Sequence, residues 1–293
     1  MPLTYLYCAI NNYQRKIQTK NQVKLDCTVI VVGNITVGGT GKTPLTIHIV
    51  KSLQKAGYKP AIITRGYGGK ANHWPQSVTA DSSADLVGDE AVLMAQRTNV
   101  PVYAGANRLG SIEQLLKTHE CDVIVSDDGM QHYKLPRDIQ IAVIDGKRHL
   151  GNGFCLPAGP LREKKERLSS CDFIVEMSLS GEVLVNLSSK EEKVLSELSG
   201  AEVQALTGIG NPQRFYSTLE DHGLTLCKHS FPDHYSFDKN DLNYADDSIV
   251  IMTEKDAVKC KPLIGNSQQY WYLPVTASFN NDFDLVLLNK LEA

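Results

Sequence analysis

The sequence predicts an α/β protein, with a mainly parallel sheet in a first unit and a second, smaller α/β unit after it. Short β-branched runs alternate with helical patterns through the first part of the chain. Continuous apolar strands separated by helices imply a parallel sheet that is covered on both faces. A glycine-rich loop joins the first run to a helical pattern, and a second, shorter alternation follows residue 178.

The first unit is expected to span residues 1–178. Its expected strands are Thr28–Val32, Ala61–Thr64, Pro101–Ala104, Asp122–Ser126, Ile139–Ile144 and Asp172–Met177. The helical patterns between them cover Thr43–Ala56, Asp89–Arg97 and Asn107–His119. Each pattern recurs with a period near 3.6 residues, as an amphipathic helix does.

The second unit, with a linker, is expected to span residues 179–293, because Ser178–Gly181 marks a boundary in composition. A polar, Lys/Glu-rich helix is expected at Lys190–Leu198. Strands are expected at Val203–Thr207, Leu224–Lys228, Ser248–Thr253 and Trp271–Val275, with a helix at Pro212–Asp221.

Composition excludes several classes of protein. Hydrophobic residues make up 42% of the 293 residues and charged ones 22%, which is typical of globular proteins. The net charge of −3 disfavours a general nucleic-acid binder. The seven cysteines form no C-x-x-C pair, so we expect reduced thiols in a cytosolic compartment. The chain has no apolar run of eighteen residues and no signal-peptide pattern.

The glycine-rich loop has the residue types that a phosphate cradle needs. Small residues let successive backbone N–H groups converge on anionic oxygens, a lysine reaches the β- and γ-phosphates, and a hydroxyl binds magnesium. These residues are Gly38, Gly39, Gly41, Lys42 and Thr43, with Pro44 suited to the first turn of the following helix. Thr36 stands where the G-x-x-x-x-G-K-[ST] pattern has glycine. The alternative is a simple glycine-rich turn, which the strand–loop–helix context disfavours.

A pair of carboxylates follows another strand. An apolar run that delivers an acid at its carboxyl end is how P-loop folds place a second magnesium contact, so Asp127 and Asp128 are candidate metal residues. The alternative is a solvated turn.

Arg65 follows a strand and Asp89 begins a helix, so both could converge at the edge of the sheet where ligands bind. Thr253–Asp256 superficially resembles a guanine-reading motif, but the asparagine is absent and the spacing is wrong.

Seven sequence blocks together resemble one enzyme family. They are Val32–Pro44, Thr64–Lys70, Gly88–Glu90, Asp127–His132, Leu156–Glu163, Phe231–His234 and Thr253–Lys259. In this order they resemble the tetraacyldisaccharide 4'-kinase family of lipid A biosynthesis over nearly the whole chain. The family also carries threonine at the position of Thr36.

The resemblance implies a P-loop NTPase-like domain that uses ATP and Mg²⁺. It implies transfer of the γ-phosphoryl group to the 4'-hydroxyl of a tetraacylated glucosamine disaccharide 1-phosphate. The implied nucleotide-binding residues are Thr36, Val37, Gly38, Gly39, Thr40, Gly41, Lys42 and Thr43. The implied metal residues are Thr43, Asp127, Asp128 and Glu163. The implied catalytic residues are Lys42, Asp89 as the base and His234 as its partner, and the substrate candidates are Arg65, His132 and Arg162.

Other interpretations remain open at this point. Asp89 could favour a helix N-terminus electrostatically, His132 could be structural, and His234 could belong to a turn. The basic run of Arg162, Lys164, Lys165 and Arg167 is typical of a solvated helix face, or it holds the 1-phosphate. Two other functions compete: a P-loop transferase or ligase acting on a small soluble acid, and a non-enzymatic nucleotide switch.

The start of the chain predicts an amphipathic helix. Its apolar face consists of Leu3, Leu6, Tyr7, Ile10 and Ile17, and basic residues follow at Arg15, Lys16, Lys20 and Lys24. The pattern alone favours a helix docked on its own domain. The lipid substrate favours a helix that binds reversibly to the cytoplasmic face of the inner membrane. The expected partners are thus the lipid and the membrane surface, with no nucleic acid and no inferred protein partner. Members of the family usually have an additional apolar stretch before the segment that Pro2–Ile10 resembles, so this chain is expected to start later than they do.

Overall fold

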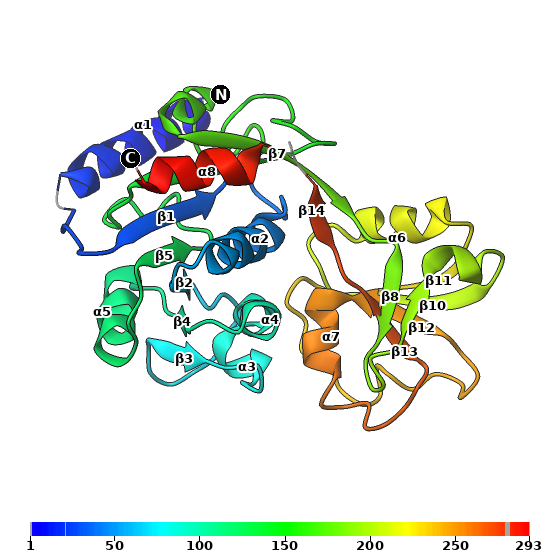
Figure 1. Cartoon of the computed structure of the whole chain (residues 1–293). Helices are drawn as coiled ribbons and strands as arrows, with labels where there is room; N and C mark the ends of the chain where they lie inside the picture. The colour runs from blue at the N-terminus through cyan, green and yellow to red at the C-terminus, as the bar shows by residue number, and fades with distance from the viewer. Residues whose placement is uncertain (1, 21, 279–281, 293) are drawn as a thin grey trace.

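The computed structural model describes residues 2–20, 22–278 and 282–292. The strands of its first sheet are β1 (Thr28–Gly33), β2 (Pro60–Thr64), β3 (Gln76–Val78), β4 (Val102–Ala104), β5 (Val123–Ser126), β6 (Ile139–Asp145), β7 (Phe173–Ser180) and β14 (Thr276–Ser278). Within the described residues they form an eight-stranded sheet in the order β14-β7-β6-β1-β5-β2-β4-β3 (Figure 1). The central strands are parallel, and β3 and β14 pair antiparallel at the two edges. The expected α/β fold with a mainly parallel sheet is confirmed.

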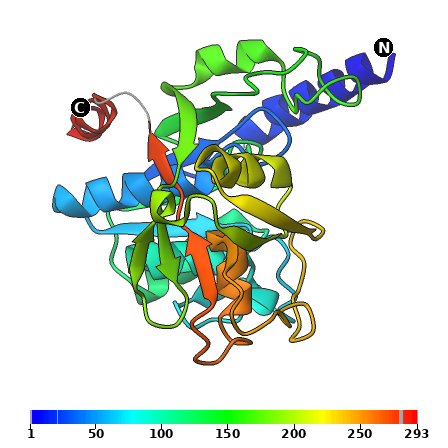
Figure 2. The ribbon, with the colours of Figure 1, turned by 90° about the vertical axis from the view of Figure 1, so that its right-hand side faces the viewer.

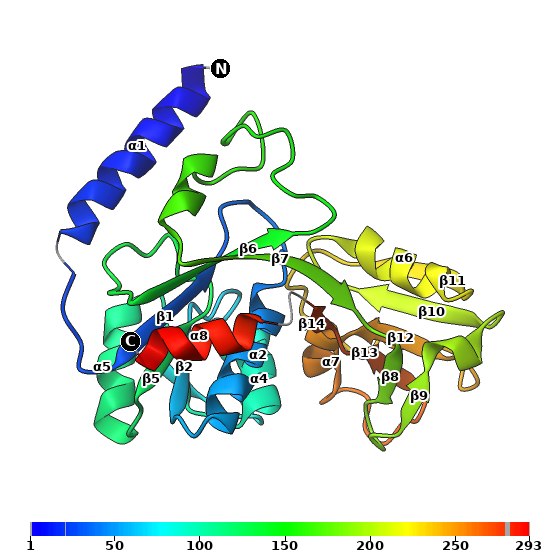
Figure 3. The ribbon, with the colours of Figure 1, turned by 45° about the horizontal axis from the view of Figure 1, so that its top comes forward.

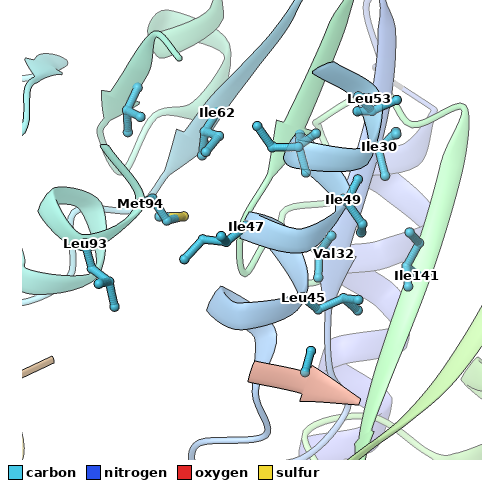
Figure 4. Packing of buried hydrophobic residues seen from close by; sticks show 14 of the residues in the cluster. Ile30, Val32, Leu45, Ile47, Ile49, Leu53, Ile62, Leu93, Met94 and Ile141 are labelled. Atoms are coloured by element: carbon cyan, nitrogen blue, oxygen red, sulfur yellow. The ribbon is translucent and has the colours of Figure 1, made fainter. Parts of the chain in front are cut away.

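Helices cover both faces of this sheet. They are α1 (Pro2–Thr19), α2 (Lys42–Lys55), α3 (Ala84–Val87), α4 (Asp89–Thr98), α5 (Arg108–Thr118) and α8 (Phe283–Glu292), and a 3-10 turn covers Lys165–Ser170. Side chains alternate along β1, so Ile30 and Val32 pack on the side of α2 and α4. Figure 4 shows this packing, with Leu45 and Ile49 of α2 beside Ile30 and Val32. Val29 packs on the opposite side, with α5.

Helix α2 forms because its apolar residues recur on one face. Leu45, Ile49 and Leu53 follow one another at intervals of four and are fully buried. Pro44 stands in the first turn, where its missing N–H costs no hydrogen bond. The helix therefore begins directly behind the glycine-rich loop and fixes the position of that loop against the sheet.

The second sheet has its own core. Its strands are β8 (Val183–Asn186), β9 (Glu192–Val194), β10 (Glu202–Thr207), β11 (Thr225–Ser230), β12 (Val250–Thr253) and β13 (Tyr270–Leu273). In the described residues they run in the order β11-β10-β12-β13-β8-β9, and the first four are parallel. Two helices, α6 (Pro212–Asp221) and α7 (Glu254–Cys260), pack against them.

The helix expected at Lys190–Leu198 is wrong. The segment forms β9, which pairs antiparallel with β8 in a hairpin, and then a 3-10 turn at Leu195–Leu198. The Lys193 ammonium lies 4.9 Å from the ring centroid of Trp271 on β13. Pairing with β8 therefore outweighs the helical preference of a Lys/Glu-rich segment, a preference worth only a few tenths of a kcal/mol per residue.

The two units are joined by strands rather than by a single linker. β7 runs through residue 178, where the sequence places the division, and β14 pairs back onto it antiparallel. Phe283 and Leu287 of α8 then pack in the core cluster that contains α2. Figure 2 shows α1 and α8 on opposite sides of the molecule, consistent with their separate clusters. The division at residue 178 stays a prediction, and the segment after β13 returns to the first sheet.

Helix α1 docks through a narrow face that includes the half-buried Tyr7, and it leaves the other residues of its predicted apolar face exposed. Thr4 and Cys8 are buried, and Cys8 packs with Ile35 and Met130. Leu3 is 66% exposed and Leu6 57% exposed. Figure 3 shows α1 reaching beyond the sheet, on the far side from the second unit. No helix among the described residues is long and apolar enough to cross a bilayer.

Candidate active site

The glycine-rich loop after β1 adopts the geometry of an anion cradle. Gly38 and Gly41 have φ values of +93° and +88°, which side chains with a β-carbon rarely adopt. Gly41 precedes α2, and no side chain caps the N-terminus of that helix. The first N–H groups of α2 thus remain available to an anionic ligand, with the helix dipole behind them.

Polar side chains beneath the loop hold it in place. The Asn34 amide donates to the hydroxyls of Thr36 and Thr40 at 3.3 and 3.0 Å, and its carbonyl accepts from Lys42 at 3.4 Å. Val37 donates its N–H to the carbonyl of Pro160 at 2.9 Å. Gly38 to Thr43 line the adjacent cavity, whereas the buried Thr36 and the exposed Val37 do not.

The carboxylates that follow β5 lie directly against this loop. The fully buried Asp127 accepts hydrogen bonds from Thr46 at 2.9 Å and from Thr43 at 3.4 Å. Burial, together with the nearby Glu90 and Asp128, raises the pKa of Asp127 to about 7. Burial also acts on Asp128, but Lys42 at 3.3 Å and Arg162 at 3.8 Å outweigh it, so the pKa of Asp128 lies below its ordinary value.

The donors beside the loop fit a magnesium ion. Asp128 lines the cavity, and its buried Oδ1 lies 3.3 Å from the ammonium of Lys42. Thr43 and the buried Asp127, which does not itself line the cavity, add oxygen donors next to the loop. The described residues hold no group of three or more His, Cys, Asp or Glu side chains arranged around a metal. Mg²⁺ is commonly bound by one or two carboxylates plus phosphate oxygens, so this acid pair suffices. Glu163 lies outside the cavity, where Arg167 at 3.3 Å and Gln131 at 3.0 Å already satisfy it.

A cavity of about 580 Å³ separates the two units. The parallel strands of both sheets end at it. From the first unit, the residues after β1, β2 and β5 line the cavity, and from the second, those after β10, β11 and β12 do so. Ligands of open α/β sheets bind outside the carboxyl ends of the strands, and here two such edges face one another.

Asp89 and His234 meet across the two units. His234 Nδ1 lies 3.2 Å from both carboxylate oxygens of Asp89, and the N–H of Glu90 donates to Oδ1 at 2.8 Å. Asp89 is 3% exposed and does not line the cavity, whereas His234 does. The Tyr67 ring packs at 4.6 Å from the imidazole. Burial raises the pKa of Asp89, but His234, Lys255 and Lys259 outweigh burial and bring it below its ordinary value.

The three substrate candidates separate into two groups. Arg65 and Arg162 line the cavity and supply positive charge to it. His132 lies outside the cavity, and burial together with the nearby Arg108 lowers its pKa to about 4. The structure therefore brings the two arginines to the site and leaves His132 away from it.

Sequence reasoning missed the residues that the second unit contributes. Asn211, Arg214 and Phe215 at the start of α6, and Lys255 at the start of α7, line the cavity. They follow β10 and β12, so the rule that ligands bind at the carboxyl ends of parallel strands could have found them.

The glycine-rich loop that lines this cavity suits a nucleoside triphosphate, and the same cavity is lined by His234, which pairs with the buried Asp89. These features define the class of P-loop kinases. The family model of tetraacyldisaccharide-1-P 4'-kinase matches residues 1–292. The chain therefore belongs to the tetraacyldisaccharide 4'-kinase family.

Individual relatives agree. A tetraacyldisaccharide 4'-kinase of Legionella pneumophila (strain Corby) is 47% identical over 97% of this chain and 90% of its own length. One from Methylobacillus flagellatus is 45% identical over 99% of this chain and 89% of its own length. A crystal structure of LpxK from Aquifex aeolicus in complex with ATP superposes with a TM-score of 0.82 at 27% identity. It covers 99% of this chain and 97% of the other.

Proposed function

We propose that this chain transfers the γ-phosphoryl group of ATP to the 4'-hydroxyl of tetraacyldisaccharide 1-phosphate, a step of lipid A biosynthesis. Family membership supports the reaction. The observation that carries it is the cavity, because its walls include both the lysine-containing loop and His234, which pairs with the buried Asp89. Phosphoryl transfer depends mainly on alignment and charge neutralisation, and both are available between these walls.

The nucleotide side of the reaction falls to the loop and its neighbours. Lys42 neutralises the β- and γ-phosphates, and the N–H groups from Gly38 to Thr43 orient their oxygens. Mg²⁺, held by Thr43, Asp127 and Asp128, would neutralise charge on the phosphates. Arg162 lines the same space and adds a cation near Asp128.

The acceptor hydroxyl gives its proton to the Asp89–His234 pair. Asp89 was expected to be the base, with His234 as its partner. Asp89 is buried, and His234, which lines the cavity, lies directly beside it. Nε2 of His234 already accepts a hydrogen bond from Lys255 at 3.3 Å, so we assign the carboxylate of Asp89 as the base and His234 as the partner that orients it through Nδ1.

The exposed face of α1 supports a role at the membrane surface. Leu3, Leu6, Ile10 and Ile17 are all exposed, while Thr4 and Cys8 hold the helix to the domain. An apolar strip of this kind, with Arg15 and Lys16 beside it, suits reversible binding to anionic headgroups. We place the enzyme on the cytoplasmic face of the inner membrane, where an acylated acceptor would be collected from the bilayer.

A transfer assay tests the proposed reaction. The purified chain is incubated with Mg²⁺, γ-labelled ATP and the disaccharide 1-phosphate lipid in detergent, and label on the lipid is measured. Transfer by the wild type and its loss in Lys42→Met are expected. A folded wild-type protein that leaves the lipid unlabelled would contradict the proposal. Label on a small soluble acid would identify another transferase, and slow hydrolysis without an acceptor would indicate a nucleotide switch.

A further inference from the structure

The block Thr253–Lys259 forms the turn into α7 at the carboxyl end of β12, and two of its polar residues have structural roles. The hydroxyl of Thr253 caps α7 by accepting from the N–H of Asp256 at 3.2 Å. The buried Asp256 carboxylate accepts from the N–H of Gly208 at 3.0 Å. These contacts do not explain Lys255 and Lys259, which lie four residues apart on one face of the helix.

The ammonium group of Lys255 has a partner for each of its three protons. It donates to Glu90 Oε1 at 3.3 Å, to Asp233 Oδ1 at 3.4 Å and to Nε2 of His234 at 3.3 Å. Glu90 lies on α4 of the first unit, and the other two partners lie in the loop after β11. Lys255 thus joins the two units at the imidazole itself.

These contacts fix the protonation state of His234. An ammonium can only donate, so Nε2 must accept, and the ring is neutral. The carboxylate of Asp89 can only accept, so Nδ1 carries the proton and donates to it. Asp89 and Lys255 together select one of the two tautomers, with the proton on Nδ1 and the lone pair of Nε2 bound by Lys255.

Lys259 adds a second cation from behind the carboxylate. Its ammonium lies 3.7 Å from Asp89 Oδ2 and 3.0 Å from Asp256 Oδ1, and the side chain is 7% exposed. Lys255 lies 4.0 Å from the same Oδ2. The charged groups that face Asp89 and His234 are therefore Glu90 from α4, Asp233 from the loop, and the two lysines from α7. Both lysines could be satisfied by ion pairs with Glu90, Asp233 and Asp256 alone. A purely structural role therefore does not explain why they also contact Asp89 and the imidazole of His234.

We propose that Lys255 and Lys259 are positioning residues that hold the Asp89–His234 pair ready to accept a proton, with the carboxylate ionised and the imidazole neutral. This inference rests on the proposed function. Neither lysine needs to touch the substrate, because each acts through its charge on the pair. The depressed pKa of Asp89, for which both lysines are among the causes, agrees with this role.

The pH dependence of turnover tests the proposal. Lys255→Met removes the cation and keeps the length of the side chain, and kcat is measured at saturating ATP and lipid from about pH 5.5 to about pH 9. Loss of a nearby positive charge makes a carboxylate and an imidazole both hold a proton more tightly. The acidic limb of the pH profile of kcat therefore moves to higher pH by about one unit, whether Asp89 or His234 is the group that titrates. On that limb kcat falls about tenfold, and it recovers towards the wild-type value at higher pH.

Two comparison variants isolate the charge. Lys255→Arg keeps a cation and is expected to restore most of the wild-type limb. Lys261→Met removes an exposed lysine at the end of α7, outside the cavity, and is expected to leave the whole profile unchanged. If thermal unfolding shows that Lys255→Met does not fold, Lys259→Met replaces it, with the same upward direction expected.

A readout independent of turnover separates this inference from the proposed function. ¹⁵N NMR of labelled histidines, with His234→Gln to assign the signal, reports whether the ring is neutral with its proton on Nδ1. The wild type is expected to show that form near neutral pH, and Lys255→Met a larger doubly protonated fraction. An unshifted limb and an unchanged ring signal in a folded variant would overturn the role of the lysine. A wild type without lipid transfer but with the expected ring signal would overturn only the proposed function.

Discussion

At the scale of single residues, the negative charge of Asp127 lowers the stability of the folded protein when no cation is bound beside it. It is fully buried, and its partners are the hydroxyls of Thr43 and Thr46 rather than a cation. Its pKa of about 7 lies above the ordinary value of 3.8, so the folded chain keeps a proton that the unfolded chain loses between about pH 4 and about pH 7. Without a cation, the free energy of unfolding therefore falls as the pH rises through that window.

Asp127→Asn removes the ionisable group and with it the fall in the free energy of unfolding as the pH rises. In the absence of Mg²⁺ at pH 8, we expect the variant to have a free energy of unfolding higher by roughly 1–4 kcal/mol, from about 1.4 kcal/mol per pKa unit. At pH 4 the two proteins are expected to be alike, because Asp127 is then largely protonated in both states. Denaturant titrations at both pH values measure this. The variant should also lose the stabilisation that Mg²⁺ and ATP give to the wild type. Equal stability at pH 8 would show that Asp127 is ionised without cost.

Asp89 has a different role, and its removal has a different expected effect. Asp89→Asn keeps the size of the side chain but removes the carboxylate that accepts the proton and pairs with His234. Because the proposed nucleotide contacts come from the glycine-rich loop and not from Asp89, ATP affinity is expected to stay within about twofold, while kcat falls by about 10²–10⁴-fold. Calorimetry and the transfer assay measure the two quantities. Asp81→Asn, an exposed carboxylate outside this cavity, serves as the control. Unchanged turnover would remove Asp89 from the mechanism.

At the scale of secondary structure, the sequence anticipates elements whose signals are local. β1, the glycine-rich loop and α2 carry a strand pattern, a turn signal and a helix start within thirty residues. The hairpin of β8 and β9 is missed because the Lys/Glu-rich composition of β9 favours a helix, whereas β8 is held in the sheet by β13, which is distant in sequence. The same reason explains the site. Residues that follow β1, β2 and β5 were found, whereas the contact between Asp89 and His234 depends on how the two sheets are placed.

Helix α1 can be tested as a membrane-binding element by itself. Leu6→Glu with Ile10→Glu places charge on the exposed strip without touching the docked face. Binding to anionic vesicles is expected to weaken about tenfold or more, since each apolar side chain contributes roughly 1.5–3 kcal/mol when fully buried. Thermal stability and ATP affinity should stay unchanged. Asn12→Glu with Gln14→Glu adds the same charge at exposed polar positions and is expected to weaken binding less. Equal loss in both double variants would assign the effect to charge alone.

At the scale of the whole molecule, the site exists only while the two units are held together. β7 and β14 connect them on one side, and contacts between α4 and α7 connect them on the other. Arg214 of α6 donates to Asp145, at the end of β6, at 3.0 Å. Arg97 of α4 and Glu254 of α7 form a further ion pair, and Glu254 is largely buried. Each of these contacts positions a residue that lines the cavity.

The Arg97–Glu254 pair should therefore contribute to both stability and turnover. Arg97→Met leaves a buried carboxylate without its cation, and we expect a loss of roughly 2–4 kcal/mol in the free energy of unfolding at neutral pH. Burial already raises the pKa of Glu254 against the effect of Arg97. The loss should shrink as the pH falls and Glu254 takes up a proton. Glu254→Gln in the same chain should restore part of the stability, because the uncompensated charge is gone. Lys59→Met, which breaks an exposed pair with Glu120 inside the first unit, should change stability little. Because Lys255 follows Glu254 directly, Arg97→Met should also lower kcat. If Arg97→Met lowers the free energy of unfolding as much at acidic pH as at neutral pH, this account of the pair is contradicted.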